Sequence, residues 1–171
     1  QLRRLRPPWC DRCGLPYSGE ISESFVCSNC GDLDLHFRRA RAAVVATKFV
    51  LAVIHRYKYR GAVWFEPFLA ELLLAEALPG LAGGDWDGIV PVPLHPLRLR
   101  EREFNQSARL AARLGRASGL PVWTGLVRRV KATRTQALLD RGERARNVAG
   151  SFAVRSGCSL AGRRLVVVDD V

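Results

Sequence analysis

The stretch "RLVVVDDV", residues 164–171, decides which fold this sequence predicts. Four consecutive apolar residues, Leu165 to Val168, run directly into two adjacent carboxylates, Asp169 and Asp170. A continuous apolar run of this length is typical of a strand that is buried on both faces, as the strands of parallel sheets are. Ligands of such sheets bind beyond the carboxyl ends of the strands. We therefore interpret the paired acids as half of a binding site.

Short apolar segments alternate with helical ones through the rest of the chain. Strands are predicted over 42–46, 88–94, 125–130 and 151–154, in addition to the final apolar run. Helices are predicted from Lys48 into a basic-aromatic loop that ends at Gly61, over 65–78, and over 104–118. The polar segment 131–150 is predicted to be a mobile loop with some helix. This order predicts an α/β protein with a mostly parallel sheet that helices cover on both faces.

The segments that follow three of these strands are strongly charged. Segments 95–102 and 129–146 are cationic, whereas Asp169 and Asp170 supply two carboxylates. A ligand that carries both phosphates and a vicinal diol needs this mixture, because cations bind phosphates and carboxylates accept hydrogen bonds from hydroxyls. Paired acids after a strand also occur as a helix N-cap with a solvated neighbour. The acids alone therefore do not identify the ligand.

Four of the five cysteines form two Cys-x-x-Cys pairs near the start of the chain. Cys10 and Cys13 are followed, after thirteen intervening residues, by Cys27 and Cys30. Two such pairs can supply four thiolates to one tetrahedral ion, which is the arrangement of structural Zn²⁺ sites. Two disulfides are the alternative, but no signal peptide suggests secretion. The spacing favours zinc, and Cys158 is interpreted as a small hydrophobe or a surface thiol.

Composition and charge narrow the class of protein. The 171 residues are 48% hydrophobic and 25% charged, which is typical of a soluble globular protein. No apolar run approaches the roughly 20 residues of a membrane span, so we expect a cytoplasmic protein. The 27 Lys and Arg residues exceed the 16 Asp and Glu residues by 11 charges. An excess of this size favours a polyanionic partner over a merely solvated surface.

Two groups of side chains admit two readings each. The arginines of the predicted helix over 104–118, Arg109, Arg113 and Arg116, are either a solvated helix face or a contact with nucleic acid. Tyr57 and Tyr59 alternate with cations, as they do in surfaces that stack single-stranded bases. They could equally form a hood that packs over the sheet.

Taken together, the motifs resemble those of the ComF/GntX family, competence-associated proteins that join a four-cysteine zinc ribbon to a type I phosphoribosyltransferase-like domain. The resemblance rests on the cysteine pairs and on "KYRG" (58–61), "PVPLHPLRLREREFNQ" (91–106), "KATRTQALLDRGERARNVAGSF" (131–152) and "LVVVDDV" (165–171). The last of these looks like the first half of the motif that binds phosphoribosyl pyrophosphate (PRPP). The resemblance implies a zinc ribbon over 1–35 and a transferase-like domain over 36–171.

The resemblance also implies roles for particular residues. Asp169 and Asp170 would bind the ribose hydroxyls of PRPP, and Arg98 and Arg102 would face its pyrophosphate, which carries Mg²⁺. The mobile-loop motif of the family falls on Thr133, Gln136, Arg141, Arg144 and Asn147.

This sequence departs from the family pattern in two places. Glu103 stands where the family usually has Gly, immediately before the Phe-Asn-Gln triplet. The loop that cradles the 5′-phosphate would follow Val171, so we expect the domain to be C-terminally truncated and, as given, unable to turn over PRPP.

Two functions of different classes follow. The first is a PRPP-binding, phosphoribosyltransferase-like protein of DNA uptake, whose acceptor and catalytic residues the sequence leaves open. The alternative is an adaptor that binds single-stranded DNA or a competence helicase through its zinc ribbon and basic surface, with a non-catalytic transferase fold.

Overall fold

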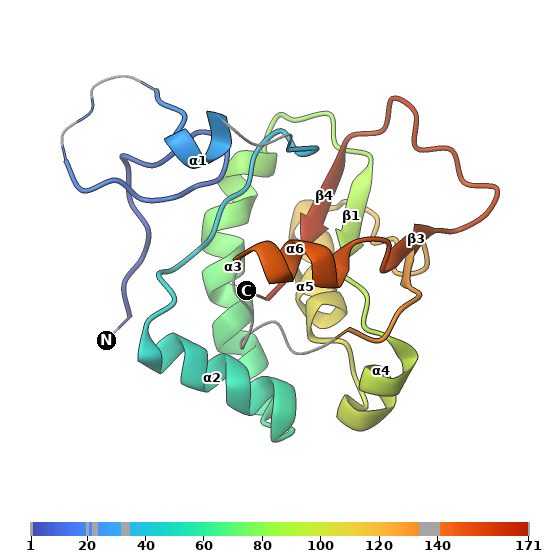
Figure 1. The fold of residues 1–171 in the computed structure, drawn as a ribbon. Coiled ribbons are helices and arrows are strands. Elements are labelled where there is room, and N and C mark those ends of the chain that lie inside the picture. The colour runs from blue at the N-terminus through green and yellow to red at the C-terminus, as the bar shows by residue number, and fades with distance from the viewer. Residues whose placement is uncertain (1, 20, 22–23, 32–34, 134–140, 171) are drawn as a thin grey trace.

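The structure, a computed structural model, describes residues 2–19, 21, 24–31, 35–133 and 141–170. Figure 1 shows helices packed beside a small sheet, with the cysteine-containing segment at the N-terminal side of the molecule. In chain order the elements are α1 (Ser28–Gly31), α2 (Lys48–Tyr59), the 3₁₀ helix η1 (Val63–Phe65), α3 (Glu66–Leu81), β1 (Gly88–Pro91), α4 (Pro96–Arg102), α5 (Gln106–Ser118), β2 (Val127–Arg129), α6 (Arg141–Val148), β3 (Phe152–Val154) and β4 (Leu165–Val168).

The apolar run before the paired acids is a strand, as predicted. β4 pairs in parallel with β1, with Ile89 opposite Val166 and Pro91 opposite Val168. Val122 forms an isolated parallel bridge to Ile89 on the other side of β1. The described residues thus form a small parallel sheet whose strands end at the same edge, and the α/β class is confirmed.

The strands β2 and β3 do not join this parallel sheet. They pair with each other in antiparallel fashion, with Val127 opposite Val154 and Arg129 opposite Phe152. Phe152 and Val154 are 40% and 43% exposed. An antiparallel sheet tolerates one face in contact with water, whereas a parallel sheet is normally covered by other elements on both faces. The expectation of one mostly parallel sheet is therefore corrected for these two strands.

Cover over the parallel sheet is uneven in the described part of the chain. α5 packs against β1 and β4, and α3 packs against α5. Val168 is buried, while Val167, which points to the opposite face, is 66% exposed. The described residues therefore do not bear out the expectation that helices cover β4 on both faces.

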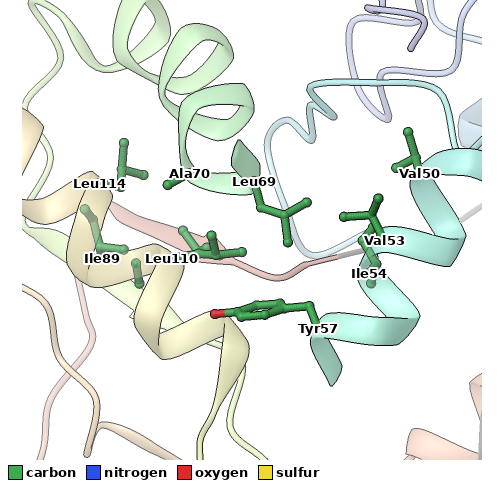
Figure 2. Packing of buried hydrophobic residues seen from close by; sticks show 11 residues of the cluster. Val50, Val53, Ile54, Tyr57, Leu69, Ala70, Ile89, Leu110 and Leu114 are labelled. Atoms are coloured by element: carbon green, nitrogen blue, oxygen red, sulfur yellow. The ribbon is translucent and has the colours of Figure 1, made fainter. Parts of the chain in front are cut away.

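The hydrophobic core lies between α2, α3, α5 and the parallel sheet. It contains Val50, Val53, Ile54, Tyr57, Leu69, Ala70, Ile89, Leu110, Ala111, Leu114 and Val168. Figure 2 shows the Tyr57 ring crossing from α2 beneath Leu69 and Leu110, with its hydroxyl turned toward α5. Because this core joins segments from both halves of the chain, it fixes the place of α2 relative to the strand ends.

The segment around α2 differs from its prediction. Residues 42–46 form no strand, and only Val44 makes a single bridge, to Arg4. The helix continues to Tyr59, so the predicted basic-aromatic loop is wrong. The apolar spacing of Val50, Val53 and Ile54 extends to Tyr57, and the cations in the last turn are favourable beside the negative end of the helix dipole.

The longest described helix, α3, begins with Glu66 and Pro67, where a proline is tolerated because its missing N–H would have no partner in the helix. It continues three residues beyond its predicted end at Leu78 and contains Pro79. Of the helices that the described residues form, none combines the length and apolar character needed to cross a bilayer.

Candidate ligand site and metal-ligand cluster

The paired acids lie at the carboxyl end of the parallel sheet, directly after β4. Asp169 Oδ1 accepts a hydrogen bond of 2.8 Å from the hydroxyl of Ser107 and one of 2.9 Å from the backbone N–H of Asp170. Ser107 is 1% exposed, so its hydroxyl is held in place by the packing around it. The first acid is therefore oriented by the start of α5.

Asn105 fixes the start of α5 beside the end of β1. Its side-chain oxygen accepts hydrogen bonds from the N–H groups of Ser107 and Ala108, which caps the helix. Its side-chain nitrogen donates to the carbonyl of Val92, one residue past β1. One residue thus ties the strand end to the helix that orients Asp169.

The second acid is paired with a lysine from a distant helix. Lys58 Nζ, in the last turn of α2, lies 2.9 Å from Asp170 Oδ2. The two side chains are 19% and 3% exposed. Asp170 therefore sits in an almost dry environment with a cation beside it.

The pKa of Asp169 is raised to about 6. Desolvation by neighbouring protein atoms is the main cause, and the charge of Asp170 adds to it. The hydrogen bond from Ser107 opposes the rise. Asp169 keeps an exposed surface, so its carboxylate is crowded by protein on one side and remains reachable from solvent.

Both arginines predicted to face pyrophosphate lie on α4 rather than in a loop. Arg98 is 43% exposed and pairs with Glu101 at 2.8 Å. The guanidinium of Arg102 lies 4.5 Å from the centroid of the Tyr59 ring. Its Nε is buried and has no hydrogen-bond partner among the described residues. Among the described residues Arg102 therefore keeps one hydrogen-bond donor without a partner.

A third arginine, Arg129 at the end of β2, interacts electrostatically with Asp169, Arg98 and Arg102. Burial lowers its pKa, the neighbouring charges of Arg102 and Arg98 lower it further, and Asp169 opposes the change. Its Nε is also buried without a hydrogen-bond partner among the described residues. The influence of Asp169, Arg102 and Arg98 on its pKa indicates that Arg129 lies near the first acid and near both predicted cations.

The structure places the predicted mobile-loop residues only in part. Thr133 accepts a hydrogen bond from Arg129 Nη2, which links it to the charged edge. Asn147 lies in α6, and its carbonyl accepts a hydrogen bond from the Ser151 hydroxyl. Gln136 lies outside the described residues. Arg141 and Arg144 belong to α6, but their side chains are outside the described part of the chain.

Two arginines of α5 make a contact that sequence reasoning did not consider. Arg109 and Arg113 donate through Nε to the carboxylate of Glu66, the latter at 3.0 Å, and Tyr57 donates to the same carboxylate at 3.4 Å. The Glu66 side chain is 5% exposed. These arginines neutralise a buried acid, whereas Arg116 is exposed.

The two tyrosines also differ from each other. Tyr57 is fully buried in the core, as the hood reading expects. Tyr59 is 48% exposed and lies under Arg102. Only Tyr59 therefore offers a ring at the charged edge.

The four cysteines at the N-terminal side form one cluster. The sulfur atoms of Cys10, Cys13, Cys27 and Cys30 all lie within 4.8 Å of one another. All four are free thiols, which excludes the disulfide alternative, and so is Cys158, which is exposed. Gly14 permits the turn after the first pair, since its φ is +73° and an added Cβ would lie 2.9 Å from the carbonyl oxygen of Ala40. The four thiols are positioned to hold one metal ion.

Thiol acidity differs across this cluster. Burial opposes ionisation of Cys10, but hydrogen bonds from the backbone N–H groups of Cys13, Cys27 and Arg12 lower its pKa to about 6. Burial and the neighbouring thiols raise the pKa of Cys30. Cys10 is therefore the first thiolate available to a metal, which binds only deprotonated thiols.

Glu103, the departure from the family pattern, ends α4 in the left-handed region. Its φ is +66°, and its N–H donates to the carbonyl of Leu99 at 2.8 Å. This conformation favours glycine because a Cβ crowds the backbone there. A Gly at this position in the family thus has a conformational explanation.

Replacing Glu103 by Gly should raise the free energy of unfolding by about 0.5–1 kcal/mol, because relief of the left-handed strain exceeds the entropy that glycine adds to the unfolded chain. Urea denaturation measures the change. Glu103→Ala is the matched control, since it removes the carboxylate but keeps the Cβ. Equal stabilisation by both variants would contradict the conformational explanation and point to the charge instead.

Lys58, Ser107 and Arg129 are the site residues that sequence reasoning did not single out. Lys58 carried no local signal beyond its place in the quoted segment 58–61, and Ser107, which follows the quoted segment 91–106, carried none. Arg129 is the first residue of segment 129–146, which was predicted to be cationic. The sequence did not show which basic residue of this region lies near the acids.

Fold and clusters together define a class: an α/β protein with a four-cysteine metal-ligand cluster and a charged edge where a small parallel sheet ends. Comparison with known proteins finds relatives over almost the whole chain. Competence protein F of Haemophilus influenzae is 28% identical over 170 residues, which cover 96% of this chain and 72% of that protein. DNA utilization protein YhgH of Salmonella typhimurium is 32% identical over 171 residues, with coverage of 98% and 73%.

The protein of the same name from Escherichia coli is 31% identical over 165 residues, which cover 95% of this chain and 70% of that protein. No family model matches the chain, and no solved structure matches it at a significant level. The chain belongs to the ComF family, the family of Competence protein F and DNA utilization protein YhgH.

Proposed function

We propose that this protein binds PRPP at the carboxyl end of the parallel sheet and acts in DNA uptake as a phosphoribosyltransferase-like protein. The observation that carries the proposal is the meeting of opposite charges at one edge. Asp169 lies within electrostatic reach of Arg129, whose pKa the charges of Arg102 and Arg98 also affect, and Asp170 is paired with Lys58. A ligand with a diol at one end and phosphates at the other matches this arrangement.

The roles follow from the contacts. Asp169, held by Ser107, and Asp170 would accept hydrogen bonds from the two ribose hydroxyls. The guanidinium groups of Arg102 and Arg129, whose Nε atoms have no hydrogen-bond partner among the described residues, would bind the pyrophosphate. Positioning of this kind supplies much of the catalysis in transfer reactions at the anomeric carbon, because charge develops on the ribose and on the leaving group.

The residues present fit the two metal ions that the family implies. Carboxylate oxygens are the donors that Mg²⁺ prefers, and Asp170 Oδ2, which lies 2.9 Å from Lys58 Nζ, accepts no hydrogen bond among the described residues. When bound with PRPP, Mg²⁺ would neutralise charge on the pyrophosphate. Four thiols within 4.8 Å suit a tetrahedral Zn²⁺ with a structural role, since such a site leaves no coordination position for a substrate.

A second function is supported by charge and by relatives. The net charge of +11 favours a polyanion, and the names of two relatives refer to DNA utilization. An adaptor that grips single-stranded DNA or a helicase would use the basic surface and would not need the acids. Substitution of Asp169 and Asp170 therefore distinguishes the two functions.

Changing both Asp169 and Asp170 to Asn should weaken PRPP binding by at least about tenfold, because charged hydrogen bonds of this type contribute about 1.5–3 kcal/mol each. Single-stranded DNA should bind as well or slightly better, since two negative charges leave a basic protein. Calorimetry with Mg²⁺ and PRPP, beside a DNA titration at several salt concentrations, measures both affinities.

The matched control changes Asp85 and Asp87, which precede the amino end of β1, to Asn. It removes the same charge from the opposite end of the same sheet and should leave PRPP affinity unchanged. If the Asp169/Asp170 variant binds PRPP like the wild type and DNA more weakly, the adaptor function is favoured instead.

A further inference from the structure

The ion pair between Lys58 and Asp170 has features that a surface salt bridge lacks. The nitrogen and oxygen are 2.9 Å apart and both side chains are largely buried. The backbone of Lys58 is held in place by its neighbours in the last turn of α2, since Tyr57 is fully buried and the Tyr59 ring lies under Arg102. The packing of α2 therefore delivers a cation to the second acid.

The contact is electrostatic rather than a directed hydrogen bond. Asp170 Oδ2 lies within ion-pair distance of Lys58 but accepts no hydrogen bond of good geometry among the described residues. A ligand hydroxyl aligned with the oxygen lone pair can improve on such a contact. The ion pair thus compensates the charge of Asp170, while its Oδ2 can still accept a hydrogen bond from a ligand.

Charge arithmetic shows what the lysine changes. Two adjacent carboxylates on a strand end carry a charge of −2, which attracts a hard divalent cation. The Lys58 ammonium reduces this charge to −1 and occupies the space beside one of the oxygens. Arg129 lies within electrostatic reach of the other acid. The acids are therefore already compensated by the chain itself.

We propose that Lys58 is a built-in counter-ion that keeps free divalent cations off Asp169 and Asp170, so that the pair selects a ligand that brings its own phosphates with the metal. The inference rests on the proposed function only for the identity of that ligand. In a purely structural role, the same lysine would contribute to stability and leave cation affinity unaffected.

Mn²⁺ alone tests the proposal, because its binding can be followed by the loss of its free electron-paramagnetic-resonance signal without PRPP. With the cysteine cluster loaded with Zn²⁺, Lys58→Met should bind Mn²⁺ about tenfold or more tightly than the wild type, since a like charge within a few ångströms is removed. Lys58→Arg keeps the charge and should show no gain. Lys48→Met, at the start of the same helix, removes an equal charge away from the acids and should also show none.

The double variant Lys58→Met/Asp170→Asn assigns the gain, which should disappear when the second acid loses its charge. If Lys58→Met does not fold, as circular dichroism would show, Lys58→Gln replaces it with a polar side chain of shorter reach. A Lys58 variant that folds and binds Mn²⁺ no better than the wild type overturns the proposal, and so does a gain that survives Asp170→Asn. Failure of the wild type to bind PRPP would instead refute the proposed function and leave the counter-ion result standing.

Discussion

Replacing Cys10 by Ser should abolish metal binding by the four-thiol cluster and unfold the segment that holds the two cysteine pairs. Within 10–30 the buried hydrophobic side chains of the described residues are Cys10 and Cys30 themselves, while Leu15, Tyr17 and Val26 are exposed. A segment with so little core depends on its metal, and structural zinc supplies about 10–16 kcal/mol of apparent binding free energy in comparable modules. The loss should therefore be complete rather than graded.

Metal content by mass spectrometry and limited proteolysis test this expectation. The variant should contain almost no zinc and should be cut between the cysteine pairs, while the core of α2, α3 and α5 stays resistant. Cys158→Ser is the matched control, because that thiol is exposed and outside the cluster. Retention of a full equivalent of metal by the Cys10 variant, with unchanged resistance to protease, would contradict a structural metal site.

Replacing Glu66 by Gln should lower the free energy of unfolding by about 3 kcal/mol, the lower end of the range for breaking a buried ion pair from one side. The loss arises because Arg109 and Arg113 keep their charges while the buried carboxylate disappears. The lower end applies because both arginine side chains are 44% exposed and can turn partly to water. Urea denaturation gives the difference.

The same variant predicts a pH dependence with a definite sign. Burial acts to raise the pKa of Glu66, but hydrogen bonds from Arg113 and Arg109 outweigh it and lower the pKa below its ordinary value of 4.5. A lowered pKa contributes stability above the unfolded-state value, and this stability is lost as pH falls through the folded-state value. The gap between wild type and Glu66→Gln should therefore be widest at neutral pH and shrink in acid.

Glu71→Gln is the control for this pair of measurements. Glu71 lies on the same helix and is exposed, so its loss should change stability by less than about 0.5 kcal/mol. The difference in unfolding free energy between wild type and Glu66→Gln could also stay constant between neutral and acid pH. That result would show that the carboxylate charge does not stabilise the contact of α3 with α2 and α5.

The sequence predicted those parts of the structure in which the deciding interactions are local. The four-cysteine cluster follows from two short spacings, because each Cys-x-x-Cys pair brings its own two sulfur atoms together. The strand β4 and the acids after it follow from an apolar run that ends at charge. The end of α5 at Gly119 follows from a residue that adopts the left-handed conformation easily, with a φ of +75°.

Which sheet a strand joins is not decided by local sequence, and the prediction that β2 and β3 belong to the parallel sheet was wrong. A three-residue strand with an exposed face reads the same in sequence whether it joins a parallel sheet or pairs with a neighbour. The choice is made by hydrogen bonds between distant backbones, which no periodicity encodes. The extra turn of α2 was missed for a related reason, since Tyr57 continues the helix because it reaches a core built from other helices.

The sequence by itself determined that this protein has a four-thiol cluster and a strand that presents two acids. Only the tertiary structure decided which side chains contact those acids and which arginines pair with other acids. Ser107 and Asp169 are 62 positions apart and Arg109 and Glu66 are 43 apart, so no pattern along one element relates them. The physical reason is that a buried charge must be compensated within a few ångströms, and packing alone determines which distant side chain stands there.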